Sequence, residues 1–99
     1  KDILQYTGTG TLLDITDVDF SVKNVGFTTT TTGKILDAIN YTAGVSANNY
    51  GRTKVLQIFG CEFRGCYDIM TVTGFELVDL NNTLCWYGTG TIGFQFNHR

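Results

Sequence analysis

The chain has 99 residues, of which 42% are hydrophobic and 16% are charged, and its net charge is -2. This length allows one small domain. Scattered Lys and Arg residues argue against nucleic-acid binding, and the lack of a long apolar stretch argues against membrane insertion. Because the chain starts with Lys1 and not with Met, we expect residues 1–99 to be a single segment of a longer protein.

The composition predicts an all-β fold. There are 12 glycines and no proline, and Thr, Val, Ile, Phe and Tyr are frequent. These residues favour strands joined by tight turns. No stretch has the apolar period of 3.6 residues that is typical of an amphipathic helix.

A repeat of about 23 residues runs along the chain. The sequences GTLLDI, GKILDA, YDIMTV and GTIGFQ begin at residues 10, 33, 67 and 90, in steps of 23, 34 and 23 residues. The long middle step contains AGVSANNYGR, which is polar and Gly-rich and does not alternate. We therefore predict one inserted loop at residues 43–52.

A second pattern recurs between these segments. Residues 20–27, 56–63 and 78–85 share the order apolar-x-apolar-x-Asn or Gly-x-x-apolar, with predicted bends at Asn24, Gly60 and Asn82. Asn and Gly accept the left-handed backbone of a sharp corner. The alternation before each bend predicts an inward face made of Phe20 and Val22, Leu56 and Ile58, and Val78 and Leu80.

Stacking of these repeats predicts a parallel β-helix, or β-solenoid, with about four coils of roughly 23 residues. Equivalent side chains then form ladders, with Leu12, Ile35, Ile69 and Ile92 in one and Phe27, Phe63 and Cys85 in another. A small antiparallel sandwich or barrel is the alternative, although its strands recur every 8–12 residues.

Neither end of the predicted β-helix carries a recognisable cap, so we expect other subunits or further coils to cover the ends. Three apolar side chains, Phe59, Trp86 and Tyr87, fall outside the inward pattern. They favour a homotrimer. The aromatics expected near the coil corners, Tyr6, Tyr67, Trp86 and Tyr87, suit a stacking platform for a ligand or burial between subunits.

Threonine is abundant enough to raise ice binding as an alternative function. A flat ice-binding grid needs the same outward residues in every coil. The expected columns are Thr9, Thr32, Cys66 and Thr89, then Thr7, Thr30, Arg64 and Tyr87, then Thr11, Lys34, Asp68 and Thr91. Charged and aromatic residues interrupt these columns.

Two carboxylates are candidates for catalysis, because Asp14 and Asp37 share one position of the repeat. Adjacent carboxylates can share a proton or bind a cation. Thr71 and Phe94 are expected at that position in the other coils, and Asp19 and Glu76 fall close together in the repeat.

Other chemistry finds no support in the sequence. There is no Asp-rich calcium loop, and His98 stands alone near the end of the chain, so we expect no metal site, no nucleophilic triad and no cofactor. The cysteines, Cys61, Cys66 and Cys85, are odd in number and lack CxxC spacing, which favours reduced thiols.

The inserted loop is the predicted ligand-binding region, through Asn48, Asn49, Tyr50 and Arg52. These side chains suit hydrogen bonding to sugars and stacking on them, and recognition tends to reside in long loops on rigid scaffolds. A plain surface loop that packs on its own coil or on a neighbouring chain is the alternative.

The stretches VDFSVKNVGF, VLQIFGCEFRGC and GTIGFQFN resemble the coils of right-handed parallel β-helices in bacteriophage tailspikes and tail fibres. The resemblance implies a homotrimeric virion protein that is assembled in the host cytoplasm and attaches to host-surface glycans. Pectate-lyase-like enzymes share this type of coil, so a polysaccharide lyase or glycosidase is the alternative function. A structural shaft without any ligand is a third possibility.

Overall fold

The computed structural model describes residues 2–42, 54–86, 88, 90 and 92–97. These residues form three parallel sheets and no helix. Sheet A contains β1 (Ile3–Tyr6), β4 (Gly26–Thr29), β7 (Glu62–Arg64) and β10 (Leu84–Trp86). Sheet B contains β2 (Thr11–Thr16), β5 (Lys34–Ile39), β8 (Asp68–Thr73) and β11 (Phe94–Asn97). Sheet C contains β3 (Phe20–Lys23), β6 (Val55–Phe59) and β9 (Leu77–Asn81).

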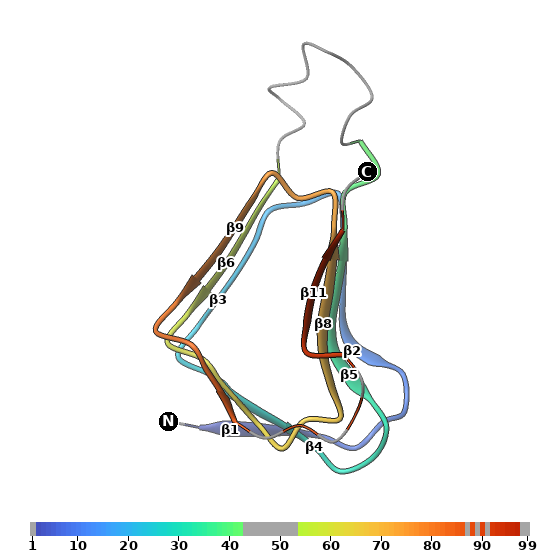
Figure 1. Cartoon of the computed structure of the whole chain (residues 1–99), viewed down its shortest axis with the longest axis vertical. Helices are drawn as coiled ribbons and strands as arrows, with labels where there is room; N and C mark the ends of the chain where they lie inside the picture. The colour runs from blue at the N-terminus through green and yellow to red at the C-terminus, as the bar shows by residue number, and fades with distance from the viewer. Residues whose placement is uncertain (1, 43–53, 87, 89, 91, 98–99) are drawn as a thin grey trace.

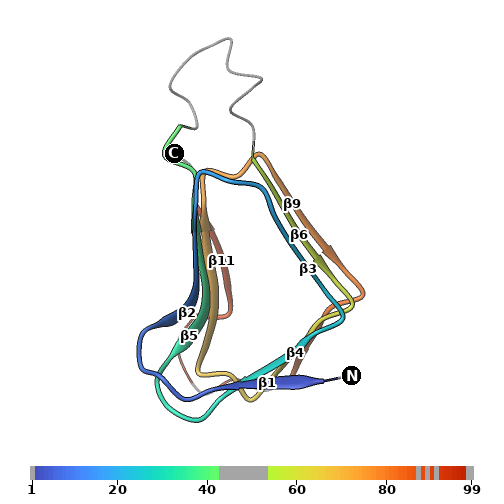
Figure 2. The same cartoon turned by 180° about the vertical axis from the view of Figure 1, so that it is seen from behind.

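The chain visits the three sheets in a fixed order, A then B then C, and each visit adds one strand beside the previous one. Figure 1 looks along the direction of stacking, and the three sheets form three sides around the core. The view from behind shows the same arrangement (Figure 2). Every strand pairing among the described residues is parallel. The all-β prediction is confirmed, and the antiparallel sandwich is wrong.

The corners between sheets C and A lie where the sequence pattern places them. Asn24, Gly60 and Asn82 have φ angles of 58°, 63° and 50°, all in the left-handed region. The Asn24 N–H donates to the Phe59 carbonyl at 2.8 Å, and the Gly60 N–H donates to the Asn81 carbonyl at 2.9 Å. A Cβ at Gly60 would lie 2.5 Å from Asn24 Oδ1, so glycine at this corner leaves room for the Asn24 side chain of the neighbouring coil.

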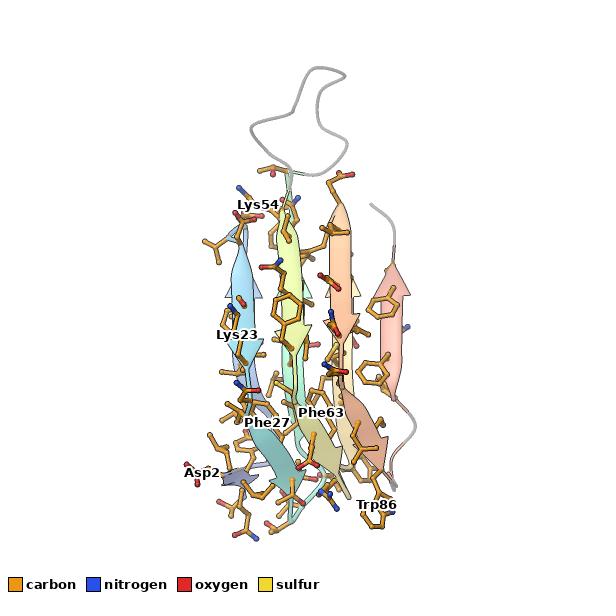
Figure 3. All side chains as sticks on the ribbon, turned by 90° about the vertical axis from the view of Figure 1, so that its left-hand side faces the viewer. Asp2, Lys23, Phe27, Lys54, Phe63 and Trp86 are labelled. Atoms are coloured by element: carbon orange, nitrogen blue, oxygen red, sulfur yellow. The ribbon has the colours of Figure 1, made fainter. Side chains whose placement is uncertain are left out.

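The core lies between the three sheets and is built from inward columns that cross the strands. Phe27 and Phe63 stack with ring centroids 5.4 Å apart, and Phe94 meets Phe63 edge-on at 5.9 Å. Figure 3 shows Phe27 and Phe63 on neighbouring strands. The predicted ladder of Phe27, Phe63 and Cys85 is confirmed by the register. The predicted inward face of sheet C is also confirmed, with Leu56 and Ile58 at its buried centre.

The last repeat differs from the prediction by one residue. Phe94 pairs with Met70 and Gln95 with Thr71, so Gln95, not Phe94, continues the row of Asp14, Asp37 and Thr71. The predicted place of Ile92 in the ladder of Ile69 is wrong for the same reason, since β11 starts only at Phe94. An extra residue before β11 turns the Phe94 ring onto the core instead of toward solvent.

The predicted column of Thr11, Lys34 and Asp68 is confirmed, but the two columns that pass through Arg64 and Cys66 are out of register. Gly26 pairs with Glu62 and Phe27 with Phe63, which puts Arg64 level with Thr28 instead of Thr30. The connection from β7 to β8 is shorter than the connection from β4 to β5, so the 34-residue step of sheet B does not hold for sheet A. A flat ice-binding face needs the same outward residue on neighbouring strands, and Lys34 and Asp68 interrupt the row of Thr11.

Asn40, directly after β5, is a buried polar residue with an exposed fraction of 0%. Its Nδ2 donates to the Gly74 carbonyl at 3.2 Å. Its Oδ1 accepts from the Thr42 backbone N–H at 3.1 Å and from the Thr42 hydroxyl at 2.6 Å. The side chain therefore ties the residues that follow β5 to the connection after β8.

Replacing Asn40 by alanine is expected to lower the free energy of unfolding by about 1–3 kcal/mol, because buried hydrogen-bonding groups lose their partner. Urea denaturation followed by circular dichroism measures the change. Asn81→Ala, at an exposed position, is the matched control and is expected to stay within about 0.5 kcal/mol of the unchanged chain. Equal effects of the two changes would show that the Asn40 hydrogen bonds contribute nothing.

Candidate functional site

The outer face of sheet C carries two rows of side chains that cross all three strands. Ser21, Gln57 and Asp79 form one row. Lys23, Phe59 and Asn81 form the next row. Alternation along each strand points these side chains away from the core. Neighbouring members of a row are separated by the strand spacing of about 4.8 Å.

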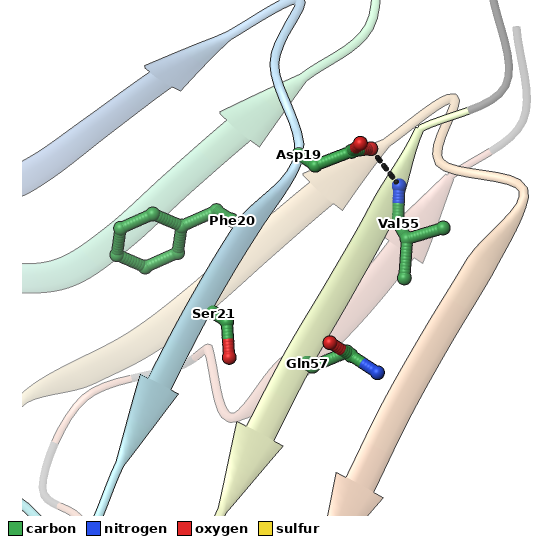
Figure 4. A pocket seen from close by; sticks show the side chains of 5 residues that line it. All are labelled: Asp19, Phe20, Ser21, Val55 and Gln57. Atoms are coloured by element: carbon green, nitrogen blue, oxygen red, sulfur yellow. Dashed lines mark hydrogen bonds between the residues drawn. The ribbon is translucent and has the colours of Figure 1, made fainter.

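A surface hollow of about 350 Å³ lies over β3 and β6. It is lined by Asp19, Phe20, Ser21, Val55 and Gln57 (Figure 4). Asp19 directly precedes β3. Its carboxylate accepts a hydrogen bond from the backbone N–H of Val55, the first residue of β6, at 2.8 Å, so this bond ties the starts of the two strands together. This bond fixes the rim of the hollow at the starts of β3 and β6.

The polar side chains of the first row are available to a ligand. Within the part of the chain that the structure describes, the Ser21 hydroxyl, the Gln57 amide and the Asp79 carboxylate make no hydrogen bond or ion pair. Together they offer hydroxyl and amide donors and hydroxyl, carbonyl and carboxylate acceptors. The row can therefore bind a ligand with many hydroxyl groups.

An aromatic ring lies beside this row. Phe59 faces outward, as its place outside the inward pattern predicts, and is half-buried. The Lys23 ammonium group lies 5.5 Å from the centre of the ring. The second row thus combines an apolar surface with a positive charge next to the polar groups of the first row.

The residues predicted to bind a ligand, Asn48, Asn49, Tyr50 and Arg52, lie outside the described residues, as does His98. Their place in the sequence is still informative. The inserted segment rejoins the described chain at Lys54, one residue before Val55, which lines the hollow.

The two catalytic candidates are neighbours, as the repeat predicts, because Asp14 pairs with Asp37 across β2 and β5. Asp37 is engaged with its surroundings. One carboxylate oxygen lies 2.8 Å from Lys34 Nζ, and the other accepts from the Thr11 hydroxyl at 2.7 Å. Lys34 also donates to the Thr71 hydroxyl at 2.9 Å. Asp37 and Lys34 together therefore join three strands of sheet B.

The second pair of acids is not adjacent. Asp19 precedes β3 and Glu76 precedes β9, and β6 lies between these strands in sheet C. The two acids do hold nearly the same position of the repeat, as expected, because each directly precedes its strand, but β6 separates them in the sheet.

Aromatic side chains elsewhere on the surface are partly engaged. Trp86 is 57% exposed, and the Arg64 guanidinium lies 4.6 Å from the centre of its ring. Arg64 also pairs with Glu62 at 3.1 Å. Tyr6 is half-buried, and its ring lies against the backbone at Gly8. The cation on Trp86 occupies a ring surface that a sugar would use.

The sequence did not single out Ser21, Gln57 or Asp79. The signal was present, because each occupies the outward position between two inward apolar residues of its strand. The hollow forms between β3 and β6, which lie far apart in the chain. Only the register of these strands shows which of their side chains line it.

The cysteines pack in or against sheet A as free thiols. Cys66 is buried and donates to the Phe27 carbonyl at 3.4 Å, whereas Cys85 is exposed. Burial, and next the charge of Cys85, raises the pKa of the Cys66 thiol from 9.0 to about 11. Cys66 thus acts as a small apolar residue.

Iodoacetamide at neutral pH is therefore expected to modify Cys85 and to leave Cys66 intact in the folded chain, as mass spectrometry of tryptic peptides would show. Because the folded-state pKa of Cys66 lies above that of the unfolded chain, its contribution to stability is complete below pH 9.0 and is lost as the pH rises to about 11. Cys66→Ala should remove this loss. Rapid modification of native Cys66 at neutral pH would contradict the burial.

Among the described residues, no three His, Cys, Asp or Glu side chains gather in a way that would hold a metal ion. The same residues include no helix with the length and hydropathy needed to cross a membrane. Searches against protein-family models, curated proteins and solved structures found no match to this chain.

Proposed function

We propose that the chain is a right-handed parallel β-helix segment of a virion tail fibre or tailspike-like protein, and that it is a receptor-binding or structural element. Two observations support the proposal. The fixed order of three parallel sheets is what a β-helix requires. The repeated stretches resemble those of phage fibres. On this proposal the protein is a homotrimer, assembled in the host cytoplasm and carried on the virion.

The ligand that this face suits best is a host-surface glycan. The observation that carries the assignment is the row of Ser21, Gln57 and Asp79 beside the outward ring of Phe59, next to the hollow. Sugars are bound by convergent hydroxyl, amide and carboxylate groups together with an apolar surface. The inserted segment rejoins the chain at the rim of this face and would extend it.

The test is binding to an immobilised panel of bacterial capsular polysaccharides and lipopolysaccharide O-antigens, followed by calorimetry with any polysaccharide that binds. Changing Gln57 and Asp79 together to alanine is expected to weaken binding by about tenfold or more, since each lost hydrogen bond contributes roughly 1 kcal/mol. Gln95→Ala, on the outer face of sheet B, is the matched control and should bind normally.

Binding that survives the double change but is lost when residues 43–52 are deleted would move the site into the inserted segment. Host adsorption that is unchanged by both would favour a shaft without a ligand.

A carbohydrate-active enzyme remains the second candidate, because Asp14 and Asp37 are neighbours in the register. The same polysaccharides serve as substrates, and the release of reducing ends measures cleavage. Cleavage that is abolished by Asp14→Asn or Asp37→Asn would replace the non-enzymatic proposal. The ion pair of Asp37 with Lys34 favours a structural role for that carboxylate.

A further inference from the structure

The outer face of sheet C presents one polar group on each strand at a regular interval. Ser21, Gln57 and Asp79, which we call the polar row, lie at paired positions of β3, β6 and β9. Figure 4 shows Ser21 and Gln57 on the first two of these strands. Neighbouring strands lie about 4.8 Å apart. A ligand that uses all three groups must therefore repeat its own polar groups at nearly this interval.

The corresponding row on the outer face of sheet B is largely engaged within the chain. It consists of Asp14, Asp37, Thr71 and Gln95. Asp37 pairs with Lys34, and the Thr71 hydroxyl donates to Gln95 Oε1 at 3.4 Å. In the part of the chain that the structure describes, the side chains of the polar row make no hydrogen bond or ion pair. Sheet C, and not sheet B, therefore has a row that is open to a repeating ligand.

Apolar side chains flank the polar row on both sides along the strands. Val55 pairs with Leu77 on one side, and Leu77 is 50% exposed. Phe59, which is half-buried and faces outward, lies on the other side. A sugar ring carries hydroxyl groups at its edge and C–H groups on its two faces. It can therefore bond to the polar row through its edge while one face contacts an apolar flank.

The interval of the polar row fits a straight chain of sugars. In a β-(1→4)-linked chain of glucose-like rings, both linkage bonds of each ring are equatorial, so the chain is nearly straight. Each ring then advances the chain by a length close to the strand spacing. An α-(1→4)-linked chain coils instead, and its successive rings turn away from a straight row. An extended peptide does not fit either, because the side chains on one of its faces recur about every 6.6 Å.

Charge narrows the class of ligand further. The charged member of the polar row is the Asp79 carboxylate, and the Asp19 carboxylate lies at the rim of the hollow. The Lys23 ammonium group lies on the next row, 5.5 Å from the centre of the Phe59 ring. The whole chain has a net charge of -2. Uronic acid or phosphate groups along the polar row would meet like charges, whereas hydroxyl and acetamido groups would not.

From the interval, the open hydrogen-bonding groups and the charge, we infer that this face binds an uncharged, straight, β-(1→4)-linked polysaccharide. The chain of sugars crosses β3, β6 and β9, parallel to the direction of stacking, with one sugar opposite each member of the polar row. This assignment rests on the proposed glycan binding, and it adds the class of glycan and its direction on the sheet.

Titration of the 99-residue chain with oligosaccharides, followed by amide signals in nuclear magnetic resonance spectra, tests the assignment. The probes are β-(1→4)-linked glucose and N-acetylglucosamine, from the monosaccharide to the hexasaccharide. At least one of these two series is expected to bind. Its affinity should rise about fivefold with each sugar up to at least the third, because each sugar adds a hydrogen bond to the row.

Two further series are matched controls for shape and charge. α-(1→4)-linked glucose has the same ring as the glucose probe in a coiled chain. β-(1→4)-linked glucuronic acid keeps the straight chain and adds one carboxylate to each sugar. Both series are expected to bind about tenfold more weakly, or less, than the uncharged β-(1→4)-linked trisaccharide that binds.

Variants at the two ends of the polar row test the place of each sugar. Ser21→Ala and Asp79→Ala each remove one hydrogen-bonding position. In either variant the trisaccharide is expected to bind about fivefold more weakly, as the disaccharide binds the unchanged chain. Gln95→Ala, on the outer face of sheet B, is the matched control and should leave the affinity for every oligosaccharide unchanged.

The results separate this assignment from the proposed glycan binding. The assigned class is wrong if binding is lost on changing Gln57 and Asp79 together, but does not grow with chain length or is as tight for either control series. It is also wrong if polysaccharides of the bacterial panel bind and neither uncharged β-(1→4)-linked series does. In these cases the glycan site itself stands. If neither the panel nor any oligosaccharide binds, glycan recognition is wrong, and the assigned class is wrong with it.

Discussion

Replacing Phe63 by alanine is expected to lower the free energy of unfolding by about 3–5 kcal/mol. The ring is 1% exposed and lies at the centre of the core. It stacks on Phe27 and meets Phe94 edge-on, so it joins sheet A to the last strand of sheet B. Truncation removes both aromatic contacts and leaves a cavity that rigid neighbouring strands cannot fill.

Phe96→Ala is the matched control for this change, because it removes the same ring from a position that is 51% exposed. Its expected effect is about 1 kcal/mol or less. Thermal and urea unfolding, followed by far-ultraviolet circular dichroism, measure both variants. Equal losses at the two positions would contradict the arrangement of the core.

Replacing Ile58 by lysine is expected to prevent folding, with a cost of about 4 kcal/mol or more. Ile58 is 1% exposed between Val22 and Leu80, and the core residues that the structure describes around it are apolar. Burial of an unpaired charge is among the most costly single changes. In a chain of this size such a cost is comparable with the whole stability.

The adjacent change, Gln57→Lys, is the control, because Gln57 faces solvent between Ser21 and Asp79. A lysine there lies beside a carboxylate, and stability should change by no more than about 0.5 kcal/mol. Far-ultraviolet circular dichroism and dispersion of amide signals in nuclear magnetic resonance spectra distinguish folded from unfolded variants. A folded Ile58→Lys, or an unfolded Gln57→Lys, would reverse the assigned faces of β6.

The sequence predicts much of this fold because its signals are local. Alternation at Leu56 and Ile58 assigns the inward face of a strand, and Asn24 and Gly60 mark corners that need a left-handed backbone. Recurrence of both signals at nearly constant spacing then predicts parallel stacking. All of these features are set by a few neighbouring residues.

Register is harder to predict, because it depends on competition between distant residues. Phe94 was expected outside the core, but burying its ring against Phe63 favours one extra residue before β11. Arg64 was aligned with Thr30 because one step was assumed for all sheets, whereas the connections between sheets differ in length. A one-residue shift reverses which face a side chain occupies.

The candidate site likewise combines features that local sequence predicts with features that depend on distant residues. Asp14 and Asp37 were correctly placed side by side, but the ion pair of Asp37 with Lys34 depends on side-chain geometry. The hollow beside Gln57 was not predicted, because two strands separated by the inserted segment form it. The hydrogen bond from Val55 to Asp19 likewise joins residues that no local pattern connects.

Nuclear Overhauser contacts across sheet C test the central claim, that successive repeats stack in parallel register, most directly. The account predicts contacts between α-protons and amide protons of paired strands, linking Val22 with the neighbourhood of Ile58, and Ile58 with that of Leu80. Close contacts between pairs of α-protons across these strands would indicate antiparallel pairing and would contradict the account.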